Sequence, residues 1–181
     1  YGGRTRALAM DATNENRLLA GGVSGGVWLS EDGGQSWSRR TPLSAHPGCV
    51  SIAQDTRAGK TDTWYYLSGE IYGTSASGGG AFYLGDGLFK STDKGLTWAP
   101  ISSTSGGNPQ AFDRFFQTGW RVVTDPVAAL DVVYMATMGT IYRSTNGGTS
   151  WTAVRGGSTA AYSYFTDVAI SPTGVLYAAL S

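Results

Sequence analysis

Short apolar runs separated by polar turns occupy most of this chain. Near the N-terminus, RALAM and RLLAGG flank the polar turn DATNEN, and GVWLS follows after a further short turn. Runs of this length, bounded by Gly, Asn, Asp and Ser, are typical of β-strands. The pattern predicts antiparallel strands joined by tight turns, and no long amphipathic helix.

The same order of four strands occurs three times. Each unit carries a box with the frame Ser-x-Asp/Asn-x-Gly-x-x-Trp: SEDGGQSW begins at residue 30, STDKGLTW at 91 and STNGGTSW at 144. The spacings of 61 and 53 residues are slightly longer than the roughly 40–50 residues of a four-stranded propeller blade, and insertions account for the excess. We therefore expect an all-β fold, a β-propeller with four-stranded antiparallel blades.

About three and a half blades are expected. Blade 1 should cover about 4–40, blade 2 about 50–101 with an insertion at 70–87, blade 3 about 119–155, and the start of blade 4 about 166–181. Propellers close with about four to eight blades, so residues 1–181 are expected to be part of a larger ring whose remaining blades are partners. A first residue other than Met also indicates a fragment or processed product.

The box residues have a structural interpretation. The Asp or Asn side chain accepts a hydrogen bond from an amide two residues on, and the Ser adds a second local acceptor. The Gly permits a positive φ, and the Trp packs as a large apolar plug. Catalysis or calcium binding is the alternative, but three equivalent copies cannot converge on one substrate. The box residues are Ser30, Asp32, Gly34, Trp37, Ser91, Asp93, Gly95, Trp98, Ser144, Asn146, Gly148 and Trp151.

The long loops lie at the other ends of the strands. Insertions at 70–87 and 102–119 are expected opposite the boxes, where long loops on a rigid scaffold usually bind ligands. Aromatic rings among a few charges suit sugar stacking or peptide capture, although the same rings could simply pack the loops onto the blades. The ligand-binding candidates are Tyr72, Tyr83, Arg114, Phe115, Trp120 and Tyr162.

Glycoside hydrolysis is the alternative function. It needs two carboxyl groups roughly 5–10 Å apart across the scissile bond. Glu70, Asp86 and Asp113 are the candidates on the expected loop side.

Composition excludes several other functions. Thirteen basic residues balance thirteen acidic ones, which disfavours nucleic acid as a partner. One Cys and one His, Cys49 and His46, cannot build a His/Cys metal centre, so no metal and no cofactor are expected. No apolar run is long enough to span a bilayer.

The boxes resemble Asp-box (BNR) repeats, which occur in sialidases, sortilin-type receptors and many secreted bacterial propellers. The segment GGRTRALAMDATNENRLLAGGVSGGVWLSEDGGQSW is particularly similar to the opening blade of bacterial sortilin-like proteins. That resemblance implies a secreted or cell-surface bacterial protein that recognises a glycan, peptide or protein. The sialidase likeness is incomplete, because Arg4, Arg114 and Arg121 are only a weak substitute for three arginines that bind a sialic carboxylate. A purely structural spacer is a third possibility.

Overall fold

The computed structural model describes residues 4–42, 48–70, 83, 85–107, 115–156 and 166–180. These residues form three four-stranded antiparallel sheets and one two-stranded sheet, in which each strand pairs with the next one along the chain. The all-β class and the four-stranded antiparallel sheets expected from the sequence are confirmed.

The strand bounds follow the apolar runs. The first sheet contains β1 (Thr5–Asp11), β2 (Asn14–Gly22), β3 (Gly26–Ser30) and β4 (Ser38–Arg39). The second contains β5 (Ser51–Gln54), β6 (Trp64–Leu67), β7 (Leu88–Ser91) and β8 (Ala99–Pro100). The third contains β9 (Gly119–Thr124), β10 (Val133–Thr137), β11 (Thr140–Ser144) and β12 (Thr152–Gly156), and the fourth contains β13 (Thr166–Ile170) and β14 (Leu176–Leu180). A single 3₁₀ turn, η1 (Phe115–Gln117), precedes β9.

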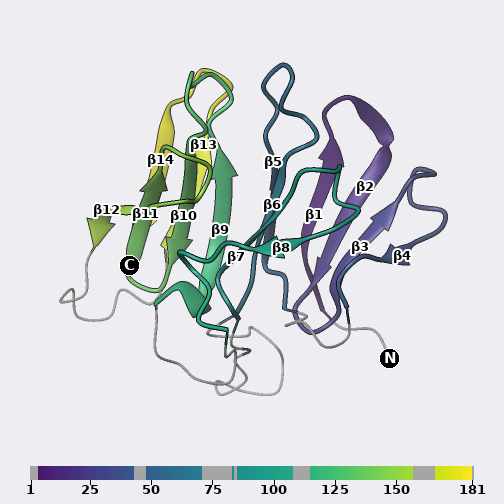
Figure 1. Cartoon of the computed structure of the whole chain (residues 1–181), viewed down its shortest axis with the longest axis horizontal. Coiled ribbons are helices and arrows are strands. Elements are labelled where there is room, and N and C mark those ends of the chain that lie inside the picture. The colour runs from purple at the N-terminus through teal and green to yellow at the C-terminus, as the bar shows by residue number, and fades with distance from the viewer. Residues whose placement is uncertain are drawn as a thin grey trace.

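The sheets stand side by side, as Figure 1 shows. The first strand of each sheet contacts the first strand of the next, so that β1 meets β5, β5 meets β9 and β9 meets β13. The fourth strands lie farthest from this row of contacts. This is the radial arrangement of propeller blades, with the first strands innermost.

A hydrophobic core fills each space between neighbouring sheets. The first core joins the first and second sheets, the second core joins the second and third, and the third joins β10 and β11 to β13. Because the second sheet has a neighbour on both sides, all four residues of β6 are buried. Tyr66 faces the first core, where its ring stacks on Phe89 and meets Trp98 edge-on, whereas Tyr65 and Leu67 belong to the second core.

Each box is closed by local hydrogen bonds. In the first box the Ser30 hydroxyl accepts the Gly34 amide (2.8 Å), and the Asp32 carboxylate accepts the Ser36 amide (2.9 Å) and hydroxyl. These bonds from Ser36, followed by the Ser30 hydroxyl, hold the pKa of Asp32 well below its usual value. The Trp37 indole N–H donates to the carbonyl of Gly34 (3.0 Å).

The Asp or Asn side chain was expected to accept the amide two residues on, and this prediction was wrong. In all three boxes the Asp or Asn side chain accepts the amide four residues on. The box Ser hydroxyl accepts the backbone amide of the Asp or Asn itself. The intervening residues include glycine with a positive φ in each box, which turns the chain far enough for the later amide to reach the carboxylate or amide oxygen. Asn146 fills its place by accepting the Ser150 amide while its own Nδ2 donates to the Ser150 hydroxyl (2.9 Å).

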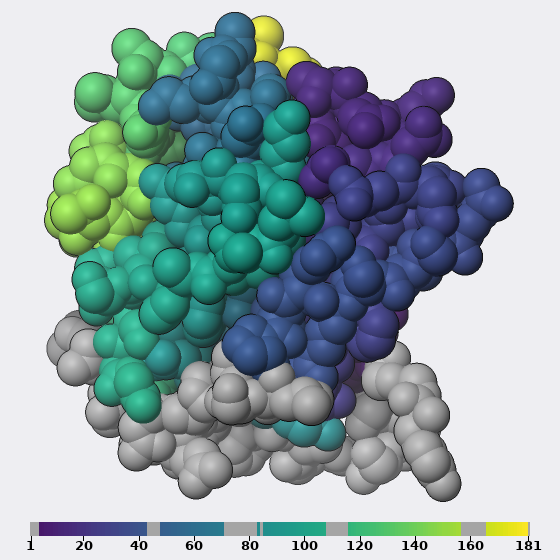
Figure 2. Space-filling view, turned by 45° about the vertical axis from the view of Figure 1, so that its right-hand side comes forward, coloured from purple at the N-terminus to yellow at the C-terminus, as the bar shows by residue number. Residues whose placement is uncertain are grey.

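The second and third boxes also pack on the preceding sheet. Trp98 packs against the first core and Trp151 against the second, and Trp151 donates its indole N–H to Ser103 of the preceding unit (3.1 Å). Trp37 belongs to the first sheet and is 37% exposed. Figure 2 shows the surfaces of the first and second units in direct contact. A box therefore holds its own hairpin and, where a sheet precedes it, joins two blades.

Candidate inner-strand pocket

The strand ends opposite the boxes form a common edge, which we call the loop edge. Here the Gly85 amide donates to the Gln117 carbonyl (2.9 Å) and the Gly119 amide to the Gly69 carbonyl (3.0 Å). These bonds tie the second sheet to the start of β9. Residues at the beginning of the innermost strands are consequently brought together at this edge.

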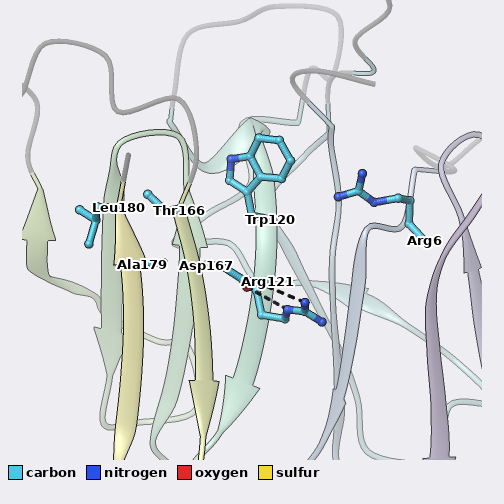
Figure 3. Close-up of a pocket in the computed structure, with 7 residues that line it drawn as sticks. All are labelled: Arg6, Trp120, Arg121, Thr166, Asp167, Ala179 and Leu180. Atoms are coloured by element: carbon cyan, nitrogen blue, oxygen red, sulfur yellow. Dashed lines mark hydrogen bonds and ion pairs between the residues drawn. The ribbon is translucent and has the colours of Figure 1, made fainter. Parts of the chain in front are cut away.

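A pocket of about 290 Å³ lies at the loop edge between the innermost strands. Its walls come from β1, from β9 and from the hairpin of β13 and β14, three segments that are far apart in the sequence (Figure 3). The lining residues are Arg6, Trp120, Arg121, Thr166, Asp167, Ala179 and Leu180. A wider groove of about 440 Å³, lined by residues of β5, β9 and the end of β13, shares Arg121 with it.

Arg6 connects the pocket to a buried carboxylate. Its guanidinium lies over the Trp120 ring, 5.7 Å from the ring centroid, and its Nη1 is 2.8 Å from Oε1 of Glu70. Arg4 pairs with the other oxygen of Glu70, whose side chain is fully buried. Because a buried carboxylate is costly unless it is paired, these two arginines account for the burial of Glu70. The carboxylate in turn fixes Arg6 beside Trp120.

A second ion pair lines the opposite wall. Arg121 Nε lies 3.0 Å from Asp167 Oδ1, and Arg121 Nη2 lies 3.4 Å from Oδ2. The two side chains are 51% and 56% exposed. The pair therefore presents a hydrogen-bond donor and an acceptor to the solvent beside the pocket.

The three carboxylate candidates are not seen together in the described structure. Glu70 is held by two arginines. Asp86 is also buried, and it accepts the Ser105 hydroxyl and the amides of Gly106 (2.6 Å) and Gly107 (3.1 Å), which makes it the cap of a turn. Asp113 lies outside the described residues. The catalytic roles of these groups stay predictions.

Of the aromatic candidates, Trp120 is the one that the structure places in the pocket. Tyr83 is 47% exposed, and its backbone forms a bridge with Glu70. Tyr72, Arg114 and Tyr162 lie outside the described residues, and of Phe115 only the backbone of η1 is described.

Arg6 and Asp167 were not among the candidates predicted from the sequence, and Arg121 was considered only as part of an incomplete arginine set. Each is a charged residue near the start of an apolar first strand, within RALAM, TDVAI and RVV respectively. A charged residue at the start of a first strand indicates a residue near the centre of the loop edge, because the innermost strands of successive blades converge there. The sequence does not show which of these charged residues form ion pairs.

Two kinds of feature are not found in the part of the chain that the structure describes. No group of three or more His, Cys, Asp or Glu side chains is arranged to hold a metal ion. No described helix is long and apolar enough to cross a membrane.

Comparison with solved structures identifies the type of blade. An ancestral enzyme of glycoside hydrolase family 74 (GH74) matches with 26% identity and a TM-score of 0.71, over 98% of this chain and 22% of that one. The GH74 enzyme of Niastella koreensis matches with 25% identity and a TM-score of 0.60, over 97% of this chain and 26% of that one. YCF48 bound to the D1 peptide matches with 17% identity and a TM-score of 0.52, over 83% of this chain and 40% of that one.

These matches establish β-propeller blades similar to those of GH74 enzymes and YCF48. The chain spans well under half the length of each matched protein. A scan against protein-family models gave no match, and a search of curated proteins gave none either.

Proposed function

We propose that this chain forms blades of a glycan-recognising propeller and that the pocket beside Trp120 holds one sugar unit. The observation that carries the proposal is a Trp ring lining a pocket in which charged donors and acceptors stand next to it. The ring gives an apolar surface for the C–H groups of a sugar, and the polar groups, including the Arg6 guanidinium that lies over the ring, orient its hydroxyls. The likeness to two GH74 enzymes, each at 25% identity or above, supports a glycan as the ligand class.

Binding is favoured over bond cleavage by the surroundings of Glu70 and Asp86, the two described residues among the three catalytic candidates. A general acid or nucleophile must reach the scissile bond. Glu70 is enclosed by Arg4 and Arg6, and Asp86 is committed to a turn. We propose that these residues support the architecture of the loop edge.

A glycoside hydrolase is the second candidate, and the GH74 likeness favours it. In that case the described blades would supply a binding subsite, while catalytic carboxylates would come from Asp113 or from other parts of the protein. Release of reducing ends from xyloglucan, abolished by Asp113→Asn, would support this candidate. No release under conditions where the polysaccharide binds would count against hydrolysis by this chain.

We also propose a location outside the cell. Two considerations support it: polymeric glycans are extracellular ligands, and the first blade resembles the opening blade of bacterial sortilin-like proteins. A protein or peptide ligand, as in YCF48 bound to the D1 peptide, is the competing class.

Affinity electrophoresis in gels containing xyloglucan, hydroxyethylcellulose or galactomannan tests the proposal. We expect retardation of the wild type and at least about tenfold weaker binding after Trp120→Ala, because about 1.4 kcal/mol of stacking corresponds to tenfold. Trp120→Phe keeps a ring and should keep most of the binding. Trp28→Ala is the matched control, since Trp28 is also partly exposed (38%) but does not line the pocket.

Melting curves of all variants accompany the gels, because Trp120 packs against the third core. Equal retardation of wild type and Trp120→Ala, with both folded, would refute the proposal. Binding to a peptide library and to none of the three polysaccharides would instead favour the competing class.

A further inference from the structure

The Arg121–Asp167 pair has a geometry suited to hydrogen-bonding a ligand in the pocket. Its shortest contact, from Nε to Oδ1, is 3.0 Å, and both side chains remain about half exposed. The pair joins β9 to β13 and stands between the pocket and the wider groove, because Arg121 lines both. A ligand that contacts Trp120 in the pocket would therefore have this pair at its side.

The chemistry of the pair matches hydroxyl groups. A guanidinium only donates hydrogen bonds, and an ionised carboxylate only accepts them, whereas a hydroxyl does both. Two adjacent sugar hydroxyls can therefore be satisfied together, one accepting from Arg121 and one donating to Asp167. An anionic group can use only the first of these partners.

The charges of the pair itself point the same way. Arg121 is offset by Asp167, whereas Arg6 shares the single carboxylate of Glu70 with Arg4. A carboxylate on the ligand would approach Arg121 beside the negative charge of Asp167. Like charges at this distance repel, and the half-exposed setting weakens the repulsion without removing it.

We infer that Arg121 and Asp167 make the pocket selective for a neutral sugar unit with adjacent free hydroxyls, and that Asp167 discriminates against carboxylated sugars. This inference rests on the proposed glycan-binding function. It adds the chemical class of the sugar and the residue that selects it.

The test compares two soluble polymers with the same β-glucan backbone, hydroxyethylcellulose and carboxymethylcellulose. Wild type should bind hydroxyethylcellulose more tightly. Asp167→Asn removes the negative charge, keeps the side-chain size and leaves Arg121 uncompensated, so the preference for the neutral polymer should fall by about fivefold. Binding of the variant to carboxymethylcellulose should also weaken as NaCl is raised.

A second ion pair in the chain provides the control. Asp62 and Lys94 lie 3.6 Å apart on the box side of the second sheet, with exposures of 58% and 46% close to those of the pocket pair. Asp62→Asn makes the same change in net charge away from the pocket. It should leave the ratio of the two affinities unchanged.

Failure of the inference can be separated from failure of the proposed function. If Trp120→Ala abolishes binding but Asp167→Asn keeps the wild-type ratio, the selectivity inference is overturned and glycan binding stands. If wild type prefers carboxymethylcellulose, or if Asp62→Asn shifts the ratio as much as Asp167→Asn, the inference is likewise overturned. If Trp120→Ala binds like wild type, the proposed site itself is wrong.

Discussion

Three glycines at the same box position offer an internally controlled test of how boxes join blades. Gly34, Gly95 and Gly148 all have a positive φ, between 82° and 96°. Replacing any of them with Ala carries the same backbone penalty, about 1–2 kcal/mol. The sites differ in what the new methyl group would meet.

The surroundings predict the order of the effects. A Cβ on Gly95 would lie 2.9 Å from Cδ1 of Leu19, a residue of the preceding blade that is fully buried and has little room to move. A Cβ on Gly34 would lie 3.4 Å from its nearest neighbour, which belongs to its own blade. Overpacking in a core adds about 1–3 kcal/mol, so Gly95→Ala should lose about 2–5 kcal/mol and Gly34→Ala about 1–2 kcal/mol.

Gly148→Ala should fall between these two. Its Cβ would approach Cδ1 of Ile101 to 2.6 Å, but Ile101 is only partly buried and its side chain can turn away. The contact is shorter than the one at Gly95, yet the neighbour is less confined.

Urea unfolding and thermal melting measure the differences. For a chain of this size each kcal/mol shifts Tm by about 2–4 °C, so the extra loss at Gly95 should lower Tm by about 2–12 °C beyond that of Gly34→Ala. In a Leu19→Ala background the Gly95 substitution should lose only the backbone penalty, because the clashing methyl groups are gone. Equal destabilisation of Gly34→Ala and Gly95→Ala, or no relief by Leu19→Ala, would refute contact between the box and the preceding blade.

Two further predictions concern pH and the third box. Hydrogen bonds from Arg57 and then Lys60 lower the pKa of Asp131, so its stabilising effect is present above the unfolded value of about 4 and is lost as pH falls through the folded pKa. The Tm difference between wild type and Asp131→Asn should therefore be measurable at pH 6 and shrink as pH falls below about 4, and a constant difference would contradict this. Asn146→Asp lets Ser150 donate its hydroxyl to a carboxylate, as in the other boxes, so the variant should match wild type within about 0.5 kcal/mol at pH 7. Its Tm should fall below that of wild type as the new carboxyl is protonated, and a large loss at pH 7 would show that the amide is required.

Local features of the fold were predictable from the sequence. Short apolar runs and turn residues identify strands such as β2 and β10, and the repeated box identifies the unit, because both signals arise from neighbouring residues. Trp98 and Trp151 pack against the cores as the expected apolar plugs, whereas Trp37 is 37% exposed, and the packing of boxes on the preceding blade was not foreseen. Three nearly identical motifs give no sign that Trp37 has no preceding sheet in the described structure while Trp98 does.

The candidate site was less predictable, because its contacts also join residues of different blades. Trp120 was selected as an exposed aromatic beside a long loop, and it does line the pocket. Glu70 was selected as a loop carboxylate, but its environment is set by Arg4, which is 66 residues away in the chain. Pairings of that range follow from how blades stack, and a single sequence does not encode them in any local pattern.

Because the second and third boxes pack on the blade before them, the unit held together by contacts is offset from the repeat seen in the sequence. A segment that is to keep this packing in another protein would have to extend from the first strand of one blade to the box Trp of the following blade. Variants in which a blade is duplicated, deleted or grafted at the apparent repeat boundary would separate Leu19 from Gly95, or Ser103 from Trp151, and expose apolar surface on both sides of the new junction.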